Sequence, residues 1–195
     1  MLYSELQCSE AIRKAVERMG FAEMTEIQEK TIPVMLAGHD VIAKAPTGTG
    51  KTCAFGIPVA EHIQPENKYP QAVIMAPTRE LAQQIAEELS NLTYFMPEVQ
   101  VACVYGGANM EKQAKRLAEG CQIVVATPGR LMDHYKHHSI DISHVTQIVL
   151  DEADEMLNMG FYKDVRHIIE MMKARKALSM FSATISREVM DIGWL

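Results

Sequence analysis

The sequence predicts an α/β fold in which a mainly parallel sheet is covered by helices on both faces. Six short apolar runs, mostly β-branched and without clean polar alternation, are spread along the chain, which is typical of strands buried on both faces. Amphipathic segments alternate with them, and such a β-α-β series favours a parallel sheet with ligands at the carboxyl ends of its strands. The 195 residues contain no internal repeat or Ser/Gly-rich linker, so we expect one domain over residues 1–195.

The expected elements alternate in a regular order. Apolar residues recur at helical spacing after Thr78 and after Asn109, so we expect a helix after each. Thr127 can cap a further helix, because Pro128 fits a first turn, where a missing N–H costs nothing. We expect strands at 41–43, 72–76, 99–105, 123–126, 147–150 and 177–182.

Composition and charge exclude several classes of protein. The 19 Lys+Arg and 25 Asp+Glu give a net charge of -6, which excludes a uniformly basic coat for nucleic acid but not a local basic groove. No apolar stretch is long enough to span a membrane, and charged residues interrupt residues 1–20, where a signal peptide needs an apolar run. The four cysteines are scattered. We therefore expect a cytoplasmic protein with reduced thiols and no membrane contact.

A phosphate-binding loop is the first chemical motif. Residues 45–52 (Ala-Pro-Thr-Gly-Thr-Gly-Lys-Thr) follow the first expected strand and open a helix. Backbone N–H groups there form an anion nest, Lys51 can reach the β- and γ-phosphates of a nucleotide, and Thr52 offers a hydroxyl to Mg²⁺. The pattern departs from its strict form at Ala45, where glycine is usual, and the alternative is a glycine-rich turn with a solvated lysine. We assign nucleotide binding to Thr47, Gly48, Thr49, Gly50, Lys51 and Thr52.

Carboxylates directly follow the fifth expected strand, which would lie beside the phosphate loop. Asp151 can hold Mg²⁺ together with Thr52, partly through water, and Glu152 can orient or deprotonate a water in line with the γ-phosphate. Taken alone, acidic residues at a helix start are more often caps. Together with the phosphate loop they indicate nucleotide hydrolysis, in which Lys51, Asp151 and Glu152 are the catalytic residues.

These motifs together resemble the N-terminal RecA-like domain of the DEAD-box ATP-dependent RNA helicases. Residues 151–154 read Asp-Glu-Ala-Asp, the signature of that family, and residues 20–28 resemble its adenine-reading Q motif, with Met24 where proline is usual. The resemblance covers nearly the whole chain in the family's order. It implies a RecA-like three-layer fold with a Q-motif region over 1–38 and a P-loop NTPase core over 39–195.

The resemblance also implies which residues hold the adenine base. Gln28 would pair with the adenine edge through both its amide donor and its amide acceptor. Taken alone, Gln28 is more typical of a capping box with Thr25, three residues earlier. Tyr3 and Phe21 would be the aromatic residues at the base, although aromatic residues are more often core or surface residues, and tyrosine replaces the commoner phenylalanine at position 3.

Further motifs of the resemblance imply RNA contacts and a coupling element. The RNA contacts would reach the sugar-phosphate backbone without sequence specificity; the alternative is surface arginines near turns. The coupling motif would be formed by Ser182 and Thr184, whose hydroxyls can bond to Asp154, and the alternative is a helix cap before Ile185. The implied RNA contacts are Pro77, Thr78, Arg79, Gly106, Gly107, Thr127, Gly129 and Arg130.

Three histidines form one further cluster. His134, His137 and His138 lie three and four residues apart, a spacing that can place metal ligands on one helix face. No acid or cysteine completes a tetrahedral set convincingly. We interpret these histidines as cations near a helix end, where they favour the helix dipole.

The sequence therefore predicts the ATP-binding domain of an RNA-dependent ATPase that uses ATP and Mg²⁺ and separates short RNA duplexes when joined to a second RecA-like domain. That second domain, with the family's arginine fingers, is expected to be missing here, which predicts a monomeric fragment that is nearly inactive alone. One alternative is a phosphate-loop kinase or other NTPase with another substrate, which leaves Gln28, Arg79 and Arg130 unexplained. The other is a nucleic-acid-binding module with a vestigial pocket.

Overall fold

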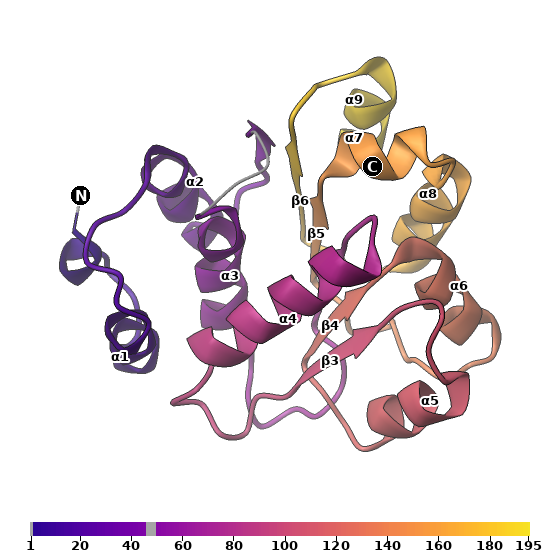
Figure 1. Ribbon diagram of the computed structural model, residues 1–195, viewed down its shortest axis with the longest axis horizontal. Coiled ribbons are helices and arrows are strands. Elements are labelled where there is room, and N and C mark those ends of the chain that lie inside the picture. Colours follow the sequence, from indigo (N-terminus) through magenta and orange to yellow (C-terminus); the bar gives the residue numbers. More distant parts are fainter. Residues whose placement is uncertain (1, 46–49) are drawn as a thin grey trace.

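The computed structural model describes residues 2–45 and 50–195, which form a six-stranded parallel sheet (Figure 1). The strand order is β1-β6-β5-β2-β4-β3, and each neighbouring pair is parallel. The predicted sheet is thus confirmed, with a strand in each of the six expected places. The strands are β1 Ile42–Lys44, β2 Ala72–Met75, β3 Val101–Val104, β4 Ile123–Ala126, β5 Gln147–Asp151 and β6 Ala177–Ser182.

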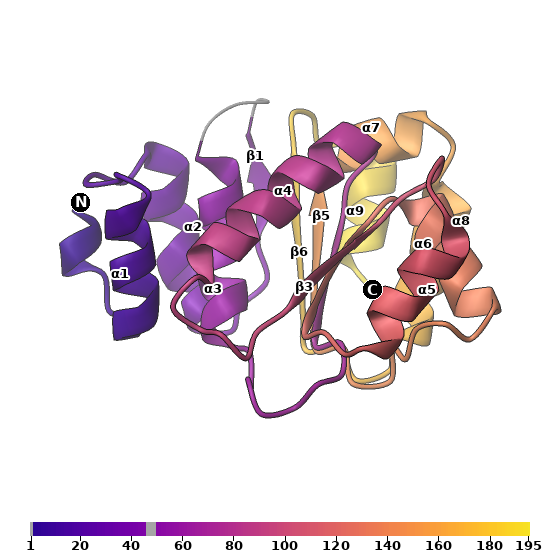
Figure 2. The ribbon, with the colours of Figure 1, turned by 60° about the horizontal axis from the view of Figure 1, so that its bottom comes forward.

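Two layers of helices cover the sheet, as Figures 1 and 2 show. One layer holds η1 (Tyr3–Glu5), α1 (Glu10–Arg18), α2 (Glu26–Leu36), α3 (Lys51–Glu61) and α4 (Arg79–Leu92). The other holds α5 (Met110–Ala118), α6 (Pro128–Lys136), α7 (Ala153–Asn158), α8 (Tyr162–Met171) and α9 (Arg187–Gly193). Helices therefore lie on both faces of the sheet, as the sequence predicts.

Each face of the sheet has its own apolar core. Alternate residues of a strand point to opposite faces. In β2, Ile74 packs in the same cluster as Phe55 of α3, whereas Val73 and Met75 pack in the cluster on the opposite face. All four residues of β2 are buried, which explains why the run shows no polar alternation in the sequence.

Side-chain caps begin two of the helices whose starts the sequence predicts. Thr78 accepts a hydrogen bond from the backbone N–H of Leu81, and Asn109 accepts one from that of Lys112. The prediction that Thr127 caps α6 is wrong: Thr127 occupies the cap position, but its side chain makes no cap hydrogen bond. Pro128 presets the backbone of the first turn, so this helix starts without help from the hydroxyl.

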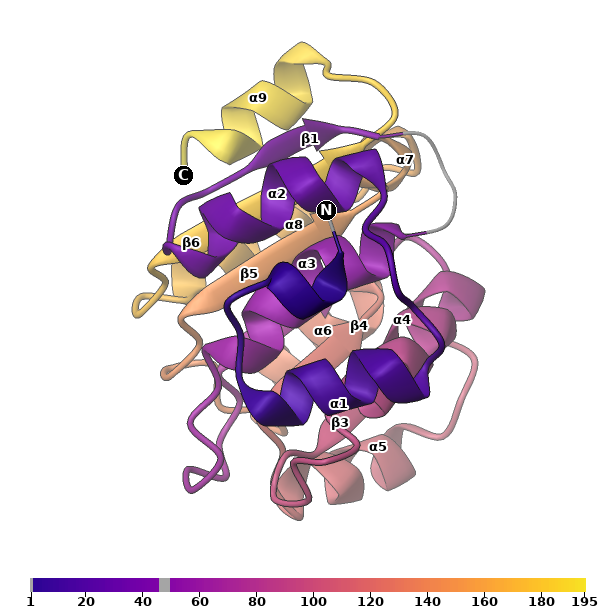
Figure 3. The same cartoon turned by 90° about the vertical axis from the view of Figure 1, so that its left-hand side faces the viewer.

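The carboxyl ends of the six strands meet at one edge of the sheet, since the strands are parallel. The segment after each strand carries one of the predicted motifs, including Gly106 and Gly107 after β3, which brings the described parts of these motifs to that edge. Figure 3 looks onto the layer with α1 to α4, where α2 and α3 lie over the sheet. In the described part of the chain, no helix has the length and apolar character needed to cross a bilayer.

Candidate functional site

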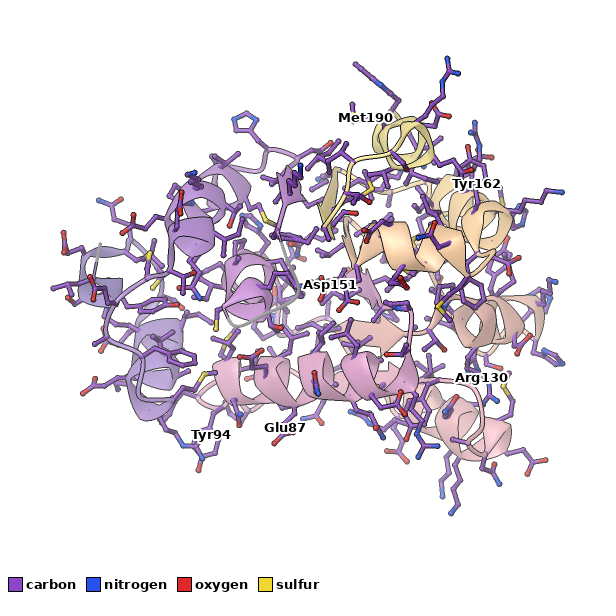
Figure 4. All side chains as sticks on the ribbon, turned by 45° about the horizontal axis from the view of Figure 1, so that its top comes forward. Glu87, Tyr94, Arg130, Asp151, Tyr162 and Met190 are labelled. Atoms are coloured by element: carbon purple, nitrogen blue, oxygen red, sulfur yellow. The ribbon has the colours of Figure 1, made fainter. Side chains whose placement is uncertain are left out.

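A cleft of about 540 Å³ opens at the carboxyl edge of the sheet, between the N-terminal segment and the start of α3. Its volume is within the range of small-molecule sites. Figure 4 labels Asp151 near the middle of the molecule, where β5 ends. Eight residues that the sequence analysis assigns to nucleotide chemistry line the cleft: Tyr3, Phe21, Gln28, Gly50, Lys51, Thr52, Asp151 and Glu152.

The phosphate loop ends in a conformation that only glycine adopts easily. Gly50 has a φ of 91° and directly precedes α3. A Cβ at this position would lie 2.9 Å from Thr25 Oγ1 and 3.0 Å from Gln28 Nε2, which is too close for any other residue. The predicted nucleotide contacts at Thr47, Gly48 and Thr49 lie outside the described residues.

Lys51, the first residue of α3, forms the centre of a buried charge cluster. Its Nζ lies 2.9 Å from Asp151 Oδ1 and 3.9 Å from Glu152 Oε2. Lys51 is only 5% exposed and Asp151 is fully buried. The alternative of a solvated lysine is therefore wrong, because buried charges persist only when they are paired.

Asp151 combines a paired oxygen with an unpaired one. Burial raises the pKa of its carboxyl group, and the Lys51 ammonium opposes that rise. Oδ1 also accepts a hydrogen bond from the backbone N–H of Glu152 at 2.9 Å. Oδ2 is buried and has no hydrogen-bond partner among the described residues. An unpartnered carboxylate oxygen is a suitable donor for a hard cation such as Mg²⁺.

Glu152 adopts a backbone conformation that is unusual for its type. Its φ of 50° lies in the left-handed region, and its side chain does not cap α7, so the alternative of a simple helix cap is wrong. Burial raises the pKa of Glu152; Lys51 opposes the rise, and the nearby carboxylates, first Asp151, add to it. Strained backbone of this kind costs about 1–3 kcal/mol and is concentrated at functional sites.

The ends of β5 and β6 are linked through Asp154. Thr184 donates to Asp154 Oδ2 from its hydroxyl at 2.9 Å and from its backbone N–H at 3.1 Å. The Ser182 hydroxyl accepts from the Asp154 backbone N–H and donates to the Thr184 carbonyl. The predicted hydrogen bond between Thr184 and Asp154 is thus present. The alternative of a helix cap is wrong, because Ser186 caps α9.

Partial burial raises the pKa of Asp154, but hydrogen bonds from Thr184, Ser182 and the backbone outweigh it, and the pKa lies below its ordinary value. Asp154 therefore stays ionised beside Asp151 and Glu152, whose pKa values shift in the other direction. The carboxyl groups of one short segment thus have pKa values shifted in opposite directions because their surroundings differ.

Gln28 forms a capping box with Thr25 and also lines the cleft. Its backbone N–H donates to Thr25 Oγ1, and its Oε1 accepts from the Thr25 backbone N–H at 3.0 Å, which completes a capping box. The Tyr3 hydroxyl also donates to Gln28 Oε1, and Gln28 Nε2 donates to the Gly50 carbonyl at 2.9 Å. Gln28 therefore joins η1, α2 and the start of α3. Phe21 is 40% exposed and its ring centroid lies 6.3 Å from that of Tyr3.

Comparison with known proteins places these features in a family. Residues 25–192 match the family described as DEAD/DEAH box helicase. The chain belongs to that family. It is 49% identical over 193 residues to the ATP-dependent RNA helicase CshA of Limosilactobacillus reuteri, covering 99% of this chain and 39% of that protein. The CshA of Listeria monocytogenes is 49% identical over 191 residues, covering 98% and 36%.

Solved structures from the same family confirm the RecA-like three-layer fold. A DEAD box protein from Methanococcus jannaschii is 40% identical with a TM-score of 0.91, covering 100% of this chain and 53% of that chain. A structure described as a hypothetical ATP-dependent RNA helicase from Sulfolobus tokodaii is 40% identical with a TM-score of 0.87, covering 94% and 53%. The chain thus spans less than two fifths of the CshA proteins named above and about half of these solved chains.

The motifs that the DEAD-box resemblance assigns to RNA form a basic rim, which we define as Arg79, Gly106, Gly107 and Arg130. Arg79, the first residue of α4, is exposed, and its guanidinium lies 4.7 Å from the centroid of the Tyr105 ring. Gly107 has a φ of 85°, and a Cβ there would lie 3.9 Å from Arg79 Nη1. In Figure 4, Arg130 lies toward α5 and α6, away from Asp151.

The remaining predicted RNA contacts differ in exposure. Thr78 is exposed and half-buried Thr127 and Gly129 lie at the start of α6, whereas Pro77 is buried. Pro77 therefore presents less surface to a ligand than its neighbours do. The rim extends from the start of α4 through the segment after β3 to the start of α6.

The largely buried side chain of Arg130 connects the start of α6 to the segment before α5 and to α5 itself. Its Nη1 donates to the Ala108 carbonyl and to Gln113 Oε1, each at 3.0 Å, and its side chain is only 13% exposed. Gln113 Oε1 also lies 3.1 Å from His134 Nε2. His134 is fully buried, and burial lowers its pKa, with Arg130 acting in the same direction. The interpretation of His134 as a cation at a helix end is therefore wrong.

Several residues of the site carry no signal in the sequence. Gln113 lies on the buried side of α5, where an isolated glutamine looks like an ordinary surface residue. Glu23, Gln84 and Glu88 also line the cleft, but polar residues on and beside helices are too common to single out. Among the described residues, no group of three or more His, Cys, Asp or Glu side chains is arranged to hold a metal ion.

Proposed function

We propose that this chain is the ATP-binding domain of an RNA-dependent ATPase, which binds Mg²⁺ with ATP and acts on RNA together with a second RecA-like domain. The observation that carries the proposal is the buried cluster of Lys51, Asp151 and Glu152 at the start of α3. Such a cluster places one cation and two carboxylates where the phosphates of a bound nucleotide meet a helix N-terminus.

Lys51 would bind the β- and γ-phosphates, in exchange for its present pairing with Asp151. Backbone N–H groups at the helix start would add hydrogen bonds to the same phosphates. Thr52 and Asp151 are the residues that would hold Mg²⁺, and the unpartnered Oδ2 of Asp151 fits that role. Because the described residues offer few ligands, much of the coordination would come from phosphates and water. When bound, Mg²⁺ would neutralise the negative charge that develops on the phosphates.

Glu152 would orient the attacking water and accept its proton at the side-chain carboxylate. A general base works best when its pKa lies nearer to the working pH than that of a free carboxylate. The burial that raises the pKa of Glu152 therefore favours proton transfer. The proton moves from the water to Glu152 while the water oxygen bonds to the γ-phosphorus and the bond to the leaving ADP breaks.

RNA binding would occur on the basic rim, through phosphates and sugars rather than base edges. Arg79 is the exposed guanidinium of that rim, and Arg130 fixes the segment that carries Gly106 and Gly107. The Asp154–Thr184 link joins the segment that carries Glu152 to the end of β6. We propose that this link transmits nucleotide state to the neighbouring domain of the longer protein.

Steady-state ATP turnover with and without RNA tests the proposal. We expect almost no RNA-stimulated turnover for this chain alone, partial turnover when a second RecA-like domain is added as a separate chain, and full turnover in the longer parent protein. An arginine finger from the second domain typically accounts for about 10³- to 10⁵-fold in rate. Full turnover by this chain alone would contradict the two-domain proposal. Transfer of phosphate to an acceptor other than water would favour the kinase alternative.

A further inference from the structure

We propose that a groove at the amino edge of the sheet binds an acidic peptide segment of a partner protein. The groove has a volume of about 610 Å³ and lies at the starts of β2, β5 and β6, whereas the nucleotide cleft lies at the opposite edge. Its lining includes His62, Tyr69, Gln71, His144, Gln147 and Lys176, and we call it the amino-edge groove. The inference does not rest on the proposed function, because none of these residues lines the nucleotide cleft.

The loop before β2 forms one wall of the groove and is held in place by Gln71, which is 5% exposed. Gln71 Oε1 accepts from the backbone N–H of Gln64 at 2.8 Å, and its Nε2 donates to the carbonyls of Gln64 and Asn67, each at 2.9 Å. The Tyr69 ring stacks on the His144 ring at a centroid distance of 3.9 Å, which attaches the loop to the segment before β5. The groove is therefore formed before any ligand binds, as binding sites usually are.

A largely buried amide of the groove lacks one of its hydrogen-bond partners. Gln147, the first residue of β5, is 8% exposed. Its Nε2 donates to the Val59 carbonyl at 3.3 Å, and because a carbonyl only accepts, the nitrogen must be the atom that faces Val59. The other amide atom, Oε1, accepts no hydrogen bond from any residue that the structure describes. A peptide backbone has an N–H group at each residue except proline and can supply the missing donor.

The charge of the groove favours a ligand with carboxylates. Lys176 lines the groove and is exposed, and no Asp or Glu of the described residues lines it. The exposed rings of His62 and His144 add N–H groups that can donate to a carboxylate. The whole chain has a net charge of -6, so a groove without a carboxylate differs from the rest of the molecule and complements an acidic partner.

The groove continues into a smaller cavity of about 290 Å³, which shares Lys176 with it. Lys173 and Arg175 line this extension together with one carboxylate, Asp40, whose Oδ1 accepts a hydrogen bond from the backbone of β6 at 2.9 Å. A long groove with cations along it fits an extended chain better than a compact molecule. Single-stranded RNA is also anionic, but its phosphates only accept hydrogen bonds and would leave Gln147 Oε1 without a donor, which favours the peptide.

The experiment titrates two fluorescein-labelled peptides into this chain at low salt, where charge attraction is screened least. One peptide repeats Glu-Ala over eight residues, and the other carries Gln in place of each Glu. Fluorescence anisotropy gives the dissociation constants. We expect about 0.1–1 mM for the Glu-Ala peptide and binding at least about tenfold weaker for the Gln-Ala peptide.

Lys176→Glu should weaken binding of the Glu-Ala peptide about three- to tenfold, because one attraction becomes a repulsion. Lys163→Glu is the matched control, since it makes the same change in net charge at an exposed lysine in the first turn of α8 that lines neither cavity. Peptide binding by Lys163→Glu should equal that of the wild type. Absence of binding up to about 5 mM Glu-Ala peptide, equal binding of the two peptides, or equal weakening by Lys163→Glu and Lys176→Glu overturns the inference.

An eight-nucleotide oligouridylate separates this groove from the basic rim. We expect Lys176→Glu to leave RNA affinity within about twofold of the wild type and Arg79→Ala to leave peptide affinity within the same range. A loss of RNA affinity in Lys176→Glu with no loss of peptide affinity would assign the groove to RNA and overturn the inference. Failure of the wild-type chain to bind RNA would count against the proposed function, and the peptide result would stand.

Discussion

The nucleotide cleft and the basic rim hold their charges in opposite ways. In the cleft, Lys51 and Asp151 are buried and paired at 2.9 Å. On the rim, Arg79 is exposed and lies over the Tyr105 ring. A buried charge depends on its partner for stability, whereas an exposed charge is stabilised by water. Substitutions in the cleft should therefore alter folding and chemistry together, and substitutions at exposed rim positions should alter binding alone.

The largest expected effect is a loss of ATP turnover. The substitution also tests whether a residue of the cleft can be changed without loss of folding. Glu152→Gln keeps the shape of the side chain and removes the proton acceptor. We expect ATP binding within about threefold of the wild type and a decrease in kcat of about 10³-fold in the longer parent protein, which is typical for loss of a general base. Calorimetry with ATP and steady-state hydrolysis with RNA measure the two quantities. Near-normal hydrolysis by Glu152→Gln would show that Glu152 is not the proton acceptor in the chemical step.

Lys51→Met should lower the free energy of unfolding by about 3 kcal/mol at neutral pH, because it leaves the Asp151 carboxylate buried without its partner. Lys51 is the main group that opposes the raised pKa of Asp151. Without Lys51 this carboxyl takes up a proton more readily. The stability deficit should therefore be largest at neutral pH and shrink as the pH falls through the raised pKa.

Chemical denaturation at several pH values measures the deficit caused by Lys51→Met. Asp151→Asn is the matched control, since it removes the charge with little change in shape. Added to Lys51→Met, it should recover more than half of the lost stability. If the two losses simply add, the pair does not behave as a coupled buried pair.

Local signals account for most of what the sequence predicts correctly. Apolar runs locate the six strands. The phosphate loop and the tetrapeptide 151–154 are each a pattern of only a few consecutive residues. The contact of Arg130 with Gln113, and of Gln113 with His134, joins α5 to α6 across separate helices. No local pattern indicates such a contact, because it depends on how two helices pack. The prediction for His134 fails for the same reason, because its burial depends on the packing of α6.

The two arginines of the rim provide the sharpest internal test of the comparison. Arg79→Ala should leave the free energy of unfolding within about 0.5 kcal/mol and reduce the slope of log K for single-stranded RNA against log salt by about 0.7. Arg130→Ala should lower the free energy of unfolding by about 1–2 kcal/mol, because the partly buried carbonyl of Ala108 and the side-chain oxygen of buried Gln113 lose a donor. Thermal unfolding and RNA titrations at several salt concentrations measure both. Equal stability losses would mean that exposure does not separate the two residues.

The smallest expected effect concerns Asp154, which is charged but only partly buried. Thr184→Val keeps the shape of the side chain and removes the hydroxyl that donates to Asp154 Oδ2 at 2.9 Å, which should cost about 1 kcal/mol at neutral pH. The folded-state pKa of Asp154 is lowered, so its contribution is complete above the unfolded pKa and is lost as the pH falls through the folded value. The difference in the free energy of unfolding between Thr184→Val and the wild type should therefore be constant near neutral pH and shrink below about pH 4.

Ser186→Ala is the control, because it removes an uncharged cap of α9 and should cost a similar amount at every pH. A deficit in Thr184→Val that does not change on acidification would show that the hydroxyl stabilises the fold without acting through the Asp154 carboxylate.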